Sequence, residues 1–187
     1  MKKRIALLAL VIAAFSFAGY GTLAYFTASE KAENVITAGN VKIDLCEETA
    51  DGDPFPEDGM TGIMPGETVD KVVYVKNVGE NTAWIRVKPE KELTFADGTK
   101  AESGSFEQYI DLNLNQDDWT EKDGWYYYRQ PVDAGTQTGK LFTQVTFSEK
   151  MGNTYKNSTV HIEVNAQAVQ TANNGSSVLE AAGWPAE

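Results

Sequence analysis

The fold is decided by residues 160–168, which read VHIEVNAQA. The apolar side chains of this stretch alternate with polar ones, and they are Val160, Ile162, Val164, Ala166 and Ala168. Such alternation predicts a β-strand with one face in a core and the other in water, the pattern of antiparallel sheets. Shorter segments repeat it at Val41–Leu45, Ile85–Val87, Ile110–Leu114 and Leu141–Phe147. We therefore expect an all-β protein, an antiparallel β-sandwich of about seven strands.

Two further segments are less regular but still strand-like. Val69–Asn77 and Trp125–Tyr128 are predicted to be strands that are buried on both faces. Turn residues such as Asp97-Gly98 separate the strands, and Glu47–Pro65 is predicted to be a long loop. Ser103–Tyr109 is the one candidate for a short helix. We place the β-sandwich domain at residues 41–170 and a C-terminal tail at 171–187, with one helical turn expected at Val178–Ala182.

The N-terminus has the layout of a secretory signal. Lys2, Lys3 and Arg4 precede a run without formal charge from Ile5 to Ser29. Small residues at Thr22 and Ala24 suit the two positions that a signal peptidase reads, which predicts cleavage just before Tyr25 and a signal peptide of residues 1–24.

A membrane anchor is the alternative for the same run. Residues 5–26 are long enough to cross a bilayer. We favour the cleaved signal because the second half of the run is rich in Gly and Thr and no basic cluster follows it. Stable membrane insertion after cleavage is not expected.

Composition limits the remaining possibilities. Cleavage would leave 163 of 187 residues, enough for a single domain with its own core. The whole chain carries a net charge of −11, and loss of the three basic leader residues brings it to −14. So acidic a surface repels nucleic acids and anionic membranes. Cys46 is the only cysteine, which excludes an internal disulfide.

The leader and the residues after it resemble a known family. The stretch Gly21-Thr22-Leu23-Ala24-Tyr25-Phe26-Thr27 is followed by acidic residues, by Asn34, by Ala38-Gly39-Asn40 and by the strand at Val41–Leu45. This order resembles the TasA/camelysin (CalY-like) family. The likeness continues more loosely through Pro65-Gly66-Glu67, Lys76-Asn77-Val78-Gly79 and Ala83–Val87.

That resemblance implies a secreted protein of the extracellular matrix or cell surface, released by a SipW-type signal peptidase. It implies a jelly-roll sandwich and self-association into biofilm-matrix fibres. It also implies that segment 25–40 is donated as a strand to the next subunit, a form of β-augmentation. The donor residues would be Tyr25, Phe26, Val35 and Ile36. A disordered N-terminal tail is the alternative for this segment.

Catalytic chemistry finds little support in the sequence. Zinc hydrolysis and nucleophilic triads both need histidines, and His161, the single one, lies on the polar face of a predicted strand. Cys46 is interpreted as structural, the alternative being a reactive thiol or an intermolecular disulfide. The acidic residues of the long loop are interpreted as a solvated surface rather than a calcium site, and they are Asp51, Asp53, Glu57 and Asp58. We expect a protein that is not an enzyme and has no metal or cofactor.

An aromatic group offers a function of another class. Alternation directs Trp125 and Tyr127 to one face of their strand and Tyr126 and Tyr128 to the other, with Trp119 nearby in sequence. Core packing and cross-strand pairing are the first interpretation. The second is a flat platform that stacks on sugar rings, which would make the chain a carbohydrate-binding module.

Overall fold

The computed structural model describes residues 35–38 and 41–186 of this chain. These residues form strands joined by loops and two short 3-10 helices. The elements are β1 (Val35–Ala38), β2 (Ile43–Glu48), β3 (Met60–Thr61), β4 (Thr68–Asn77), β5 (Ala83–Thr94), η2 (Glu107–Tyr109), β6 (Ile110–Leu112), β7 (Trp119–Lys122), β8 (Trp125–Tyr128), β9 (Phe142–Phe147), η3 (Asn153–Tyr155) and β10 (Thr159–Gln170).

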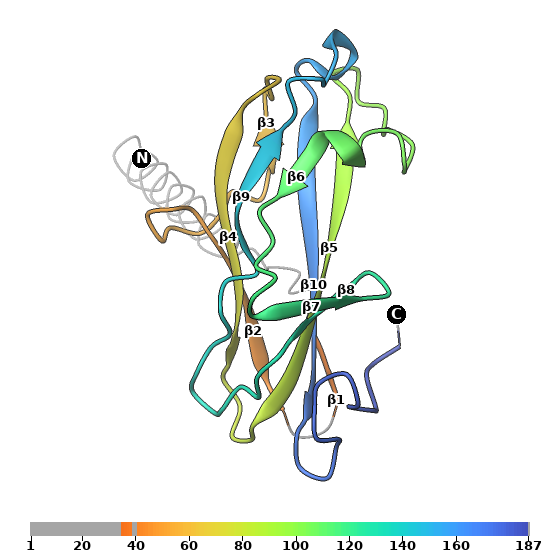
Figure 1. Cartoon of the computed structure of the whole chain (residues 1–187). Coiled ribbons are helices and arrows are strands. Elements are labelled where there is room, and N and C mark those ends of the chain that lie inside the picture. The colour runs from red at the N-terminus through yellow and green to blue at the C-terminus, as the bar shows by residue number, and fades with distance from the viewer. Residues whose placement is uncertain (1–34, 39–40, 187) are drawn as a thin grey trace, which may run out of the picture. The chain divides into compact units, whose positions relative to one another are not determined.

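The strands form two sheets that pack face to face (Figure 1). Sheet A has the order β1-β10-β5-β8-β7, with β3 beside one end of β10, and sheet B has the order β2-β4-β9-β6. The chain passes from one sheet to the other at nearly every connection, as in jelly-roll sandwiches. The predicted all-β antiparallel β-sandwich is therefore confirmed. Among the described strands, β1 and β10 form the one parallel pair.

The longest strand pairing described in sheet A joins β10 to β5. Their antiparallel register runs without interruption from Thr159 opposite Thr94 to Gln170 opposite Ala83. The apolar positions of β10 face the other sheet, and Val160, Val164 and Ala168 are each at most 2% exposed. The alternation that predicted this strand is thus realised as one fully buried face.

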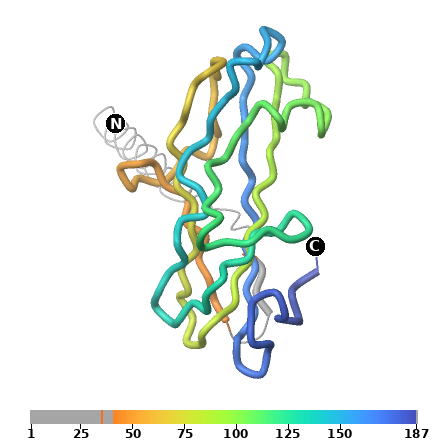
Figure 2. Tube along the Cα trace, viewed as in Figure 1, coloured from red at the N-terminus to blue at the C-terminus, as the bar shows by residue number. Residues whose placement is uncertain are grey.

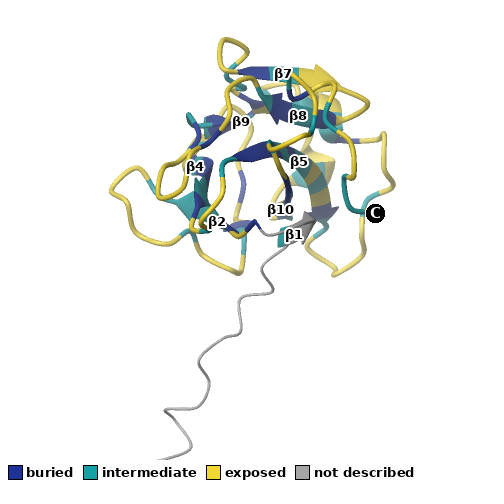
Figure 3. Cartoon of the chain, turned by 90° about the horizontal axis from the view of Figure 1, so that it is seen from below, coloured by how far each residue is buried: buried dark blue, intermediate teal, exposed yellow. Residues whose placement is uncertain are grey.

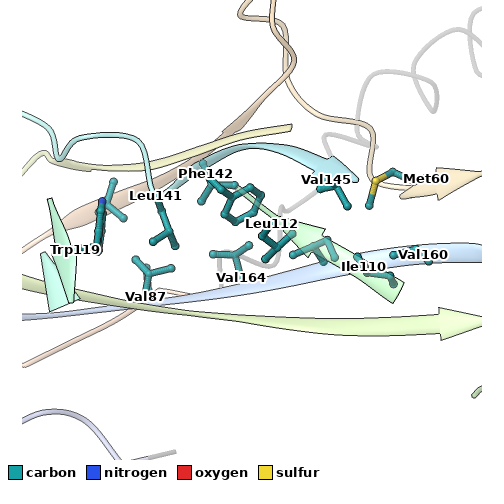
Figure 4. Packing of buried hydrophobic residues seen from close by; sticks show 14 of the residues in the cluster. Met60, Val87, Ile110, Leu112, Trp119, Leu141, Phe142, Val145, Val160 and Val164 are labelled. Atoms are coloured by element: carbon teal, nitrogen blue, oxygen red, sulfur yellow. The ribbon is translucent and has the colours of Figure 1, made fainter. Parts of the chain in front are cut away.

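The space between the sheets is filled by side chains from both (Figure 4). Val87 and Val164 from sheet A meet Leu141 and Phe142, while Trp119 lies at one end of this row beside Leu141. In the view along the strands, the buried segments lie between the two sheets and the exposed loops surround them (Figure 3). Close packing of this kind stabilises a domain that has no disulfide.

The less regular segments agree with their prediction in part. β4 is buried on both faces over Val73–Val75, as predicted. Its register shifts between Asp70 and Val73, which indicates a β-bulge. The predicted long loop contains the two-residue strand β3, which pairs with the start of β10. The predicted short helix is reduced to the 3-10 turn η2.

The C-terminal segment differs most from its prediction. Residues 171–186 do not form a free tail but fold back onto sheet A, where Val178 is 3% exposed (Figure 2). The expected helical turn at Val178–Ala182 is a simple turn over residues 178–180. The correction has a physical cause: Val178 and Trp184 are large apolar side chains, and packing on the sheet covers them, whereas the neighbouring Leu179 stays 46% exposed.

Candidate functional site

The feature with the most direct bearing on function is the edge of sheet A formed by β1. β1 lies parallel to the second half of β10, with Val35 opposite Ala166 and Ala38 opposite Val169. Val35 is half-buried and packs against the main core. We call the pairing of residues 35–38 with residues 166–169 the β1 edge.

The residues of β10 that pair with β1 are buried on both faces of the sheet. Ala166 and Ala168 face the core and are fully buried, while Gln167 and Val169 face outward and are only 3% and 2% exposed. A strand in a sandwich normally leaves its outer face in water. The burial of this outer face follows from the C-terminal segment, which lies over it.

A second hydrophobic cluster holds the C-terminal segment to sheet A. We call it the outer aromatic cluster, and its buried members are Trp84, Trp125, Tyr127, Val169 and Val178. Ala181 and Trp184 pack against it. Asn174 fixes the segment further, since its carbonyl oxygen accepts the Trp84 indole N–H at 3.0 Å and its side-chain nitrogen donates to the carbonyl oxygens of Gln170 and Ala182.

Arg86 on β5 lies at the centre of this cluster. Its Nε and Nη2 donate to the Gln167 side-chain oxygen at 2.9 and 2.6 Å, and its Nη1 donates to the Tyr127 hydroxyl at 3.0 Å. Its guanidinium carbon lies 4.1 Å from the ring centroid of Trp125 and 4.7 Å from that of Trp184. The charge is therefore held by aromatic faces and by an amide oxygen.

The turn of the C-terminal segment is held by a carboxylate. The Ser176 hydroxyl and backbone N–H both donate to Glu180 Oε2, at 2.7 and 3.2 Å. The hydrogen bond from the Ser176 hydroxyl is the main cause that lowers the pKa of Glu180 from its ordinary value. The turn is therefore best formed when Glu180 is ionised.

The residues predicted for secretion and assembly fall into two groups. Thr22, Ala24, Tyr25 and Phe26 lie outside the described residues. Val35 and Ile36 belong to β1, where they pair with residues 166 and 167 of the same chain. Strand donation to another chain thus stays a prediction, while the strand-forming tendency of this segment is visible at the β1 edge.

His161 lies where the strand pattern indicated, half-buried on β10 opposite Glu92 of β5. Gly59 packs directly against it, since a Cβ added to that glycine would come within 2.7 Å of His161 Nδ1. Gly59 also has a φ of +71°, so the close approach and the backbone both require glycine there. Cys46 is a half-buried free thiol on β2, opposite Tyr74.

The acidic residues of the long loop are exposed. Within residues 35–38 and 41–186, no group of three His, Cys, Asp or Glu side chains is arranged to hold a metal ion. The same described stretches contain no helix of the length and apolarity that a membrane crossing requires.

The aromatic strand β8 places its side chains as alternation predicted. Trp125 and Tyr127 face outward into the outer aromatic cluster, whereas Tyr126 and Tyr128 pack against the main core. Trp125 and Tyr127 are 5% and 7% exposed because the C-terminal segment covers them, so they present no flat platform to a sugar. Trp119 is buried as well, at 1% exposed.

Sequence reasoning missed Arg86 and Trp184, although one signal was present. Trp184 is a single large aromatic residue in a polar tail, and such a residue usually finds a surface to cover. Nothing in the sequence pairs it with Arg86, which comes 98 residues earlier. Comparisons with protein families, with characterised proteins and with solved structures found no match to this chain.

Proposed function

We propose that this chain is a secreted structural protein whose copies join head to tail through the N-terminal segment, as a subunit or accessory component of extracellular matrix fibres. A SipW-type signal peptidase would free the segment by cutting before Tyr25. The resemblance of the leader to the TasA/camelysin family motivates the proposal, and the β1 edge supplies its physical support.

The observation that carries the proposal is the nature of β1 as an added strand. It is four residues long, it lies at the end of sheet A, and it is parallel in a sheet whose other described pairs are antiparallel. Parallel neighbours within one chain need a long crossover, whereas a strand from a separate segment can add in either direction. The edge of β10 at residues 166–169 therefore offers a general template for an extended segment.

The energetics make β1 easy to release from the edge of its own chain. Ordering four residues costs about 1–2 kcal/mol each in backbone entropy. Each ladder hydrogen bond returns only about 0.5–1.5 kcal/mol net. Burial of Val35 adds a favourable contribution to the free energy of pairing, but so short a strand is only marginally stable within its own chain. The same segment in another copy would make the same contacts, and the residues before Val35 would extend them.

The geometry of such exchange leads to a filament. Four residues separate the end of β1 from the start of β2, so a donated β1 stays tethered close to its own domain. The donating end and the accepting edge belong to different copies at each junction. A head-to-tail junction of this kind does not close on itself unless its rotation happens to form a ring.

Three purified chains test the proposal: residues 25–187, residues 33–187 and residues 39–187. We expect 25–187 to form filaments in negative-stain micrographs, with growth followed by light scattering. Chains 33–187 and 39–187 should be folded by circular dichroism but fail to elongate, and they should cap filaments of the parent. A parent chain that stays monomeric at about 1 mM, or filaments of 39–187 that grow at the parent rate, would refute the proposal.

A pair of valine variants gives a matched control. Val35→Asp places a charge where β1 packs against the core, and we expect it to slow elongation strongly. Val78→Asp makes the same chemical change at a side chain that is 41% exposed. It should assemble like the parent. If both variants lost assembly equally, the added charge alone would explain the effect. That result would contradict a specific role for β1.

A further inference from the structure

The turn that brings the C-terminal segment back onto sheet A contains Asn174 followed by Gly175, the one Asn-Gly pair in the sequence. An asparagine side chain loses its amide when the backbone nitrogen of the next residue attacks it. Glycine hinders this attack least, because it has no side chain. Asn174 is half-buried and Gly175 is exposed, so water reaches the pair. By these criteria Asn174 is the asparagine of the chain most prone to lose its amide.

The turn requires glycine at position 175. Gly175 has a φ of +73°, a backbone conformation that other residues rarely adopt. A Cβ added there would lie 3.0 Å from the carbonyl carbon of Glu180 and 3.1 Å from the backbone nitrogen of Ala181. The close return of the chain therefore excludes a larger residue, and with it the side chain that would slow the attack on Asn174.

The turn also requires an amide side chain at position 174. Asn174 Nδ2 donates to the carbonyl oxygens of Gln170 and Ala182, both at 3.0 Å. Asn174 Oδ1 accepts the backbone N–H of Ala182 at 2.8 Å. Because that donor is a backbone N–H, the orientation of the amide is fixed, and its nitrogen faces the two carbonyl oxygens. One side chain thus joins the start of the C-terminal segment to a residue near its end.

These hydrogen bonds protect Asn174 while the C-terminal segment is docked on the outer aromatic cluster. For the Gly175 nitrogen to attack Asn174 Cγ, the side chain must rotate away from all three of its partners. In a released segment the side chain is free, and the pair reacts as it would in a flexible peptide. The rate of amide loss therefore follows the fraction of molecules in which the segment has opened.

We propose that Asn174-Gly175 is a self-modification site that makes release of the C-terminal segment irreversible. The Gly175 nitrogen gives up its proton and bonds to Asn174 Cγ, the bond between Cγ and Nδ2 breaks, and Nδ2 takes up a proton and leaves as ammonia. Water then opens the resulting cyclic imide at either of its carbonyl groups, which yields aspartate or isoaspartate. Water is the only co-reactant, and nothing is oxidised or reduced.

The products do not restore the docked segment. An ionised aspartate has no donor, so one of its oxygens would face the carbonyl oxygens of Gln170 and Ala182 in place of Nδ2. Isoaspartate adds a methylene group to the main chain and displaces the turn. The aromatic side chains beneath the segment, Trp125 and Tyr127, then lose their cover. The inference requires no strand exchange between copies.

Peptide mapping of the whole secreted chain by mass spectrometry tests the inference after incubation in mildly alkaline buffer. Val178→Asp places a charge in the outer aromatic cluster, at a side chain that is 3% exposed, and so opens the segment. We expect Asn174 in this variant to convert about tenfold faster than in the parent. Leu179→Asp adds the same charge one residue later, at a side chain that is 46% exposed. It should convert at the parent rate.

Asn157 provides an internal reference for global unfolding. It is exposed, it lies before β10, and a small residue, Ser158, follows it. Its conversion should be equal in the parent and both variants. If Asn157 also converts faster in Val178→Asp, Trp184→Ala decides the question, because it removes one contact of the segment and leaves the sheet unchanged. Conversion of Asn174 that is no faster in the opened variant, relative to Asn157, would overturn the proposal.

A second pair of variants tests whether the product prevents docking. Asn174→Asp reproduces one product, and we expect amide hydrogen exchange of residues 176–186 to be about tenfold faster than in the parent. Asn173→Asp adds the same charge to the adjacent exposed residue and should exchange like the parent. If Asn174→Asp also exchanges at the parent rate, the modified segment still docks and the proposed irreversibility is wrong.

Discussion

Replacing Arg86 with methionine should loosen the C-terminal segment and destabilise the domain. The change keeps much of the aliphatic stem and removes the guanidinium. The Gln167 side-chain oxygen, in a residue 3% exposed, then loses both of its donors. An unsatisfied buried acceptor costs about 1–3 kcal/mol. Loss of the stacked cation from Trp125 and Trp184 adds about 0.5–1 kcal/mol each. We expect a total loss of about 3 kcal/mol in the free energy of unfolding.

A double-mutant cycle separates the hydrogen bonds from the packing. Gln167→Leu alone leaves Arg86 without its main acceptor and should also destabilise. The double variant Arg86→Met, Gln167→Leu replaces both partners with apolar groups, so the cost of the orphaned acceptor disappears. The double variant should therefore be more stable than the sum of the single changes predicts, by about 1–2 kcal/mol.

Urea unfolding followed by circular dichroism and tryptophan fluorescence gives these free energies, provided that the dependence on urea concentration is the same in all variants. Two of the four tryptophans, Trp125 and Trp184, stack on Arg86, so fluorescence also reports local loosening of the segment. If the two single changes are additive, or if Arg86→Met costs less than about 0.5 kcal/mol, the assignment of Arg86 as the central contact is wrong.

Two further predictions concern processing and the ion pair between buried Lys71 and half-buried Glu47. The secreted protein should begin at Tyr25. The double change Thr22→Lys, Ala24→Lys should block cleavage, because the lysine side chains are too large for the peptidase pocket. Intact-mass measurement of culture supernatant checks both expectations, and a secreted form that retains the leader would contradict them. Lys71 is 3% exposed and lies 2.9 Å from Glu47, which is 31% exposed and keeps contact with water, so Lys71→Ala should cost about 1–3 kcal/mol, chiefly in lost packing, while Lys71→Met is nearly neutral. Burial lowers the pKa of Lys71 from 10.5, and Glu47 opposes this in part, so the folded protein binds that proton more weakly than the unfolded chain does. The contribution of Lys71 to stability should rise as pH increases from the lowered pKa toward 10.5; because burial also lowers the pKa of Lys91 in both proteins, the measured quantity is the difference in unfolding free energy between the parent and Lys71→Met, which should shift in favour of the parent across that range.

Much of the fold follows from local patterns in the sequence. β10 was predictable because its period-two alternation spans a long stretch, and only one face of it could be buried between two sheets. The division of β8 into Trp125 and Tyr127 on one face and Tyr126 on the other follows from the same geometry. These features depend on residues that are neighbours in sequence, so the alternation of apolar and polar residues is enough to predict them.

Contacts between distant segments were not predictable in this way. The outer burial of Gln167 and Val169 depends on residues 171–186, whose polar composition is typical of a free tail. The parallel direction of β1 depends on which edge is available, a property of the assembled sheet.

The second half of β10 connects the two ends of the chain. Ile36 of β1 lies in register with Gln167, and the side chain of Gln167 holds Arg86 and, through Arg86, Trp184 of the C-terminal segment. Occupancy of the sheet edge and docking of the C-terminal segment therefore share one structural element. By thermodynamic linkage, a strand that binds the edge more tightly when the segment is docked must stabilise the docked segment by the same free energy. Amide hydrogen exchange of residues 171–186 thus becomes a reporter, at one end of the chain, of whether a strand occupies the edge near the other.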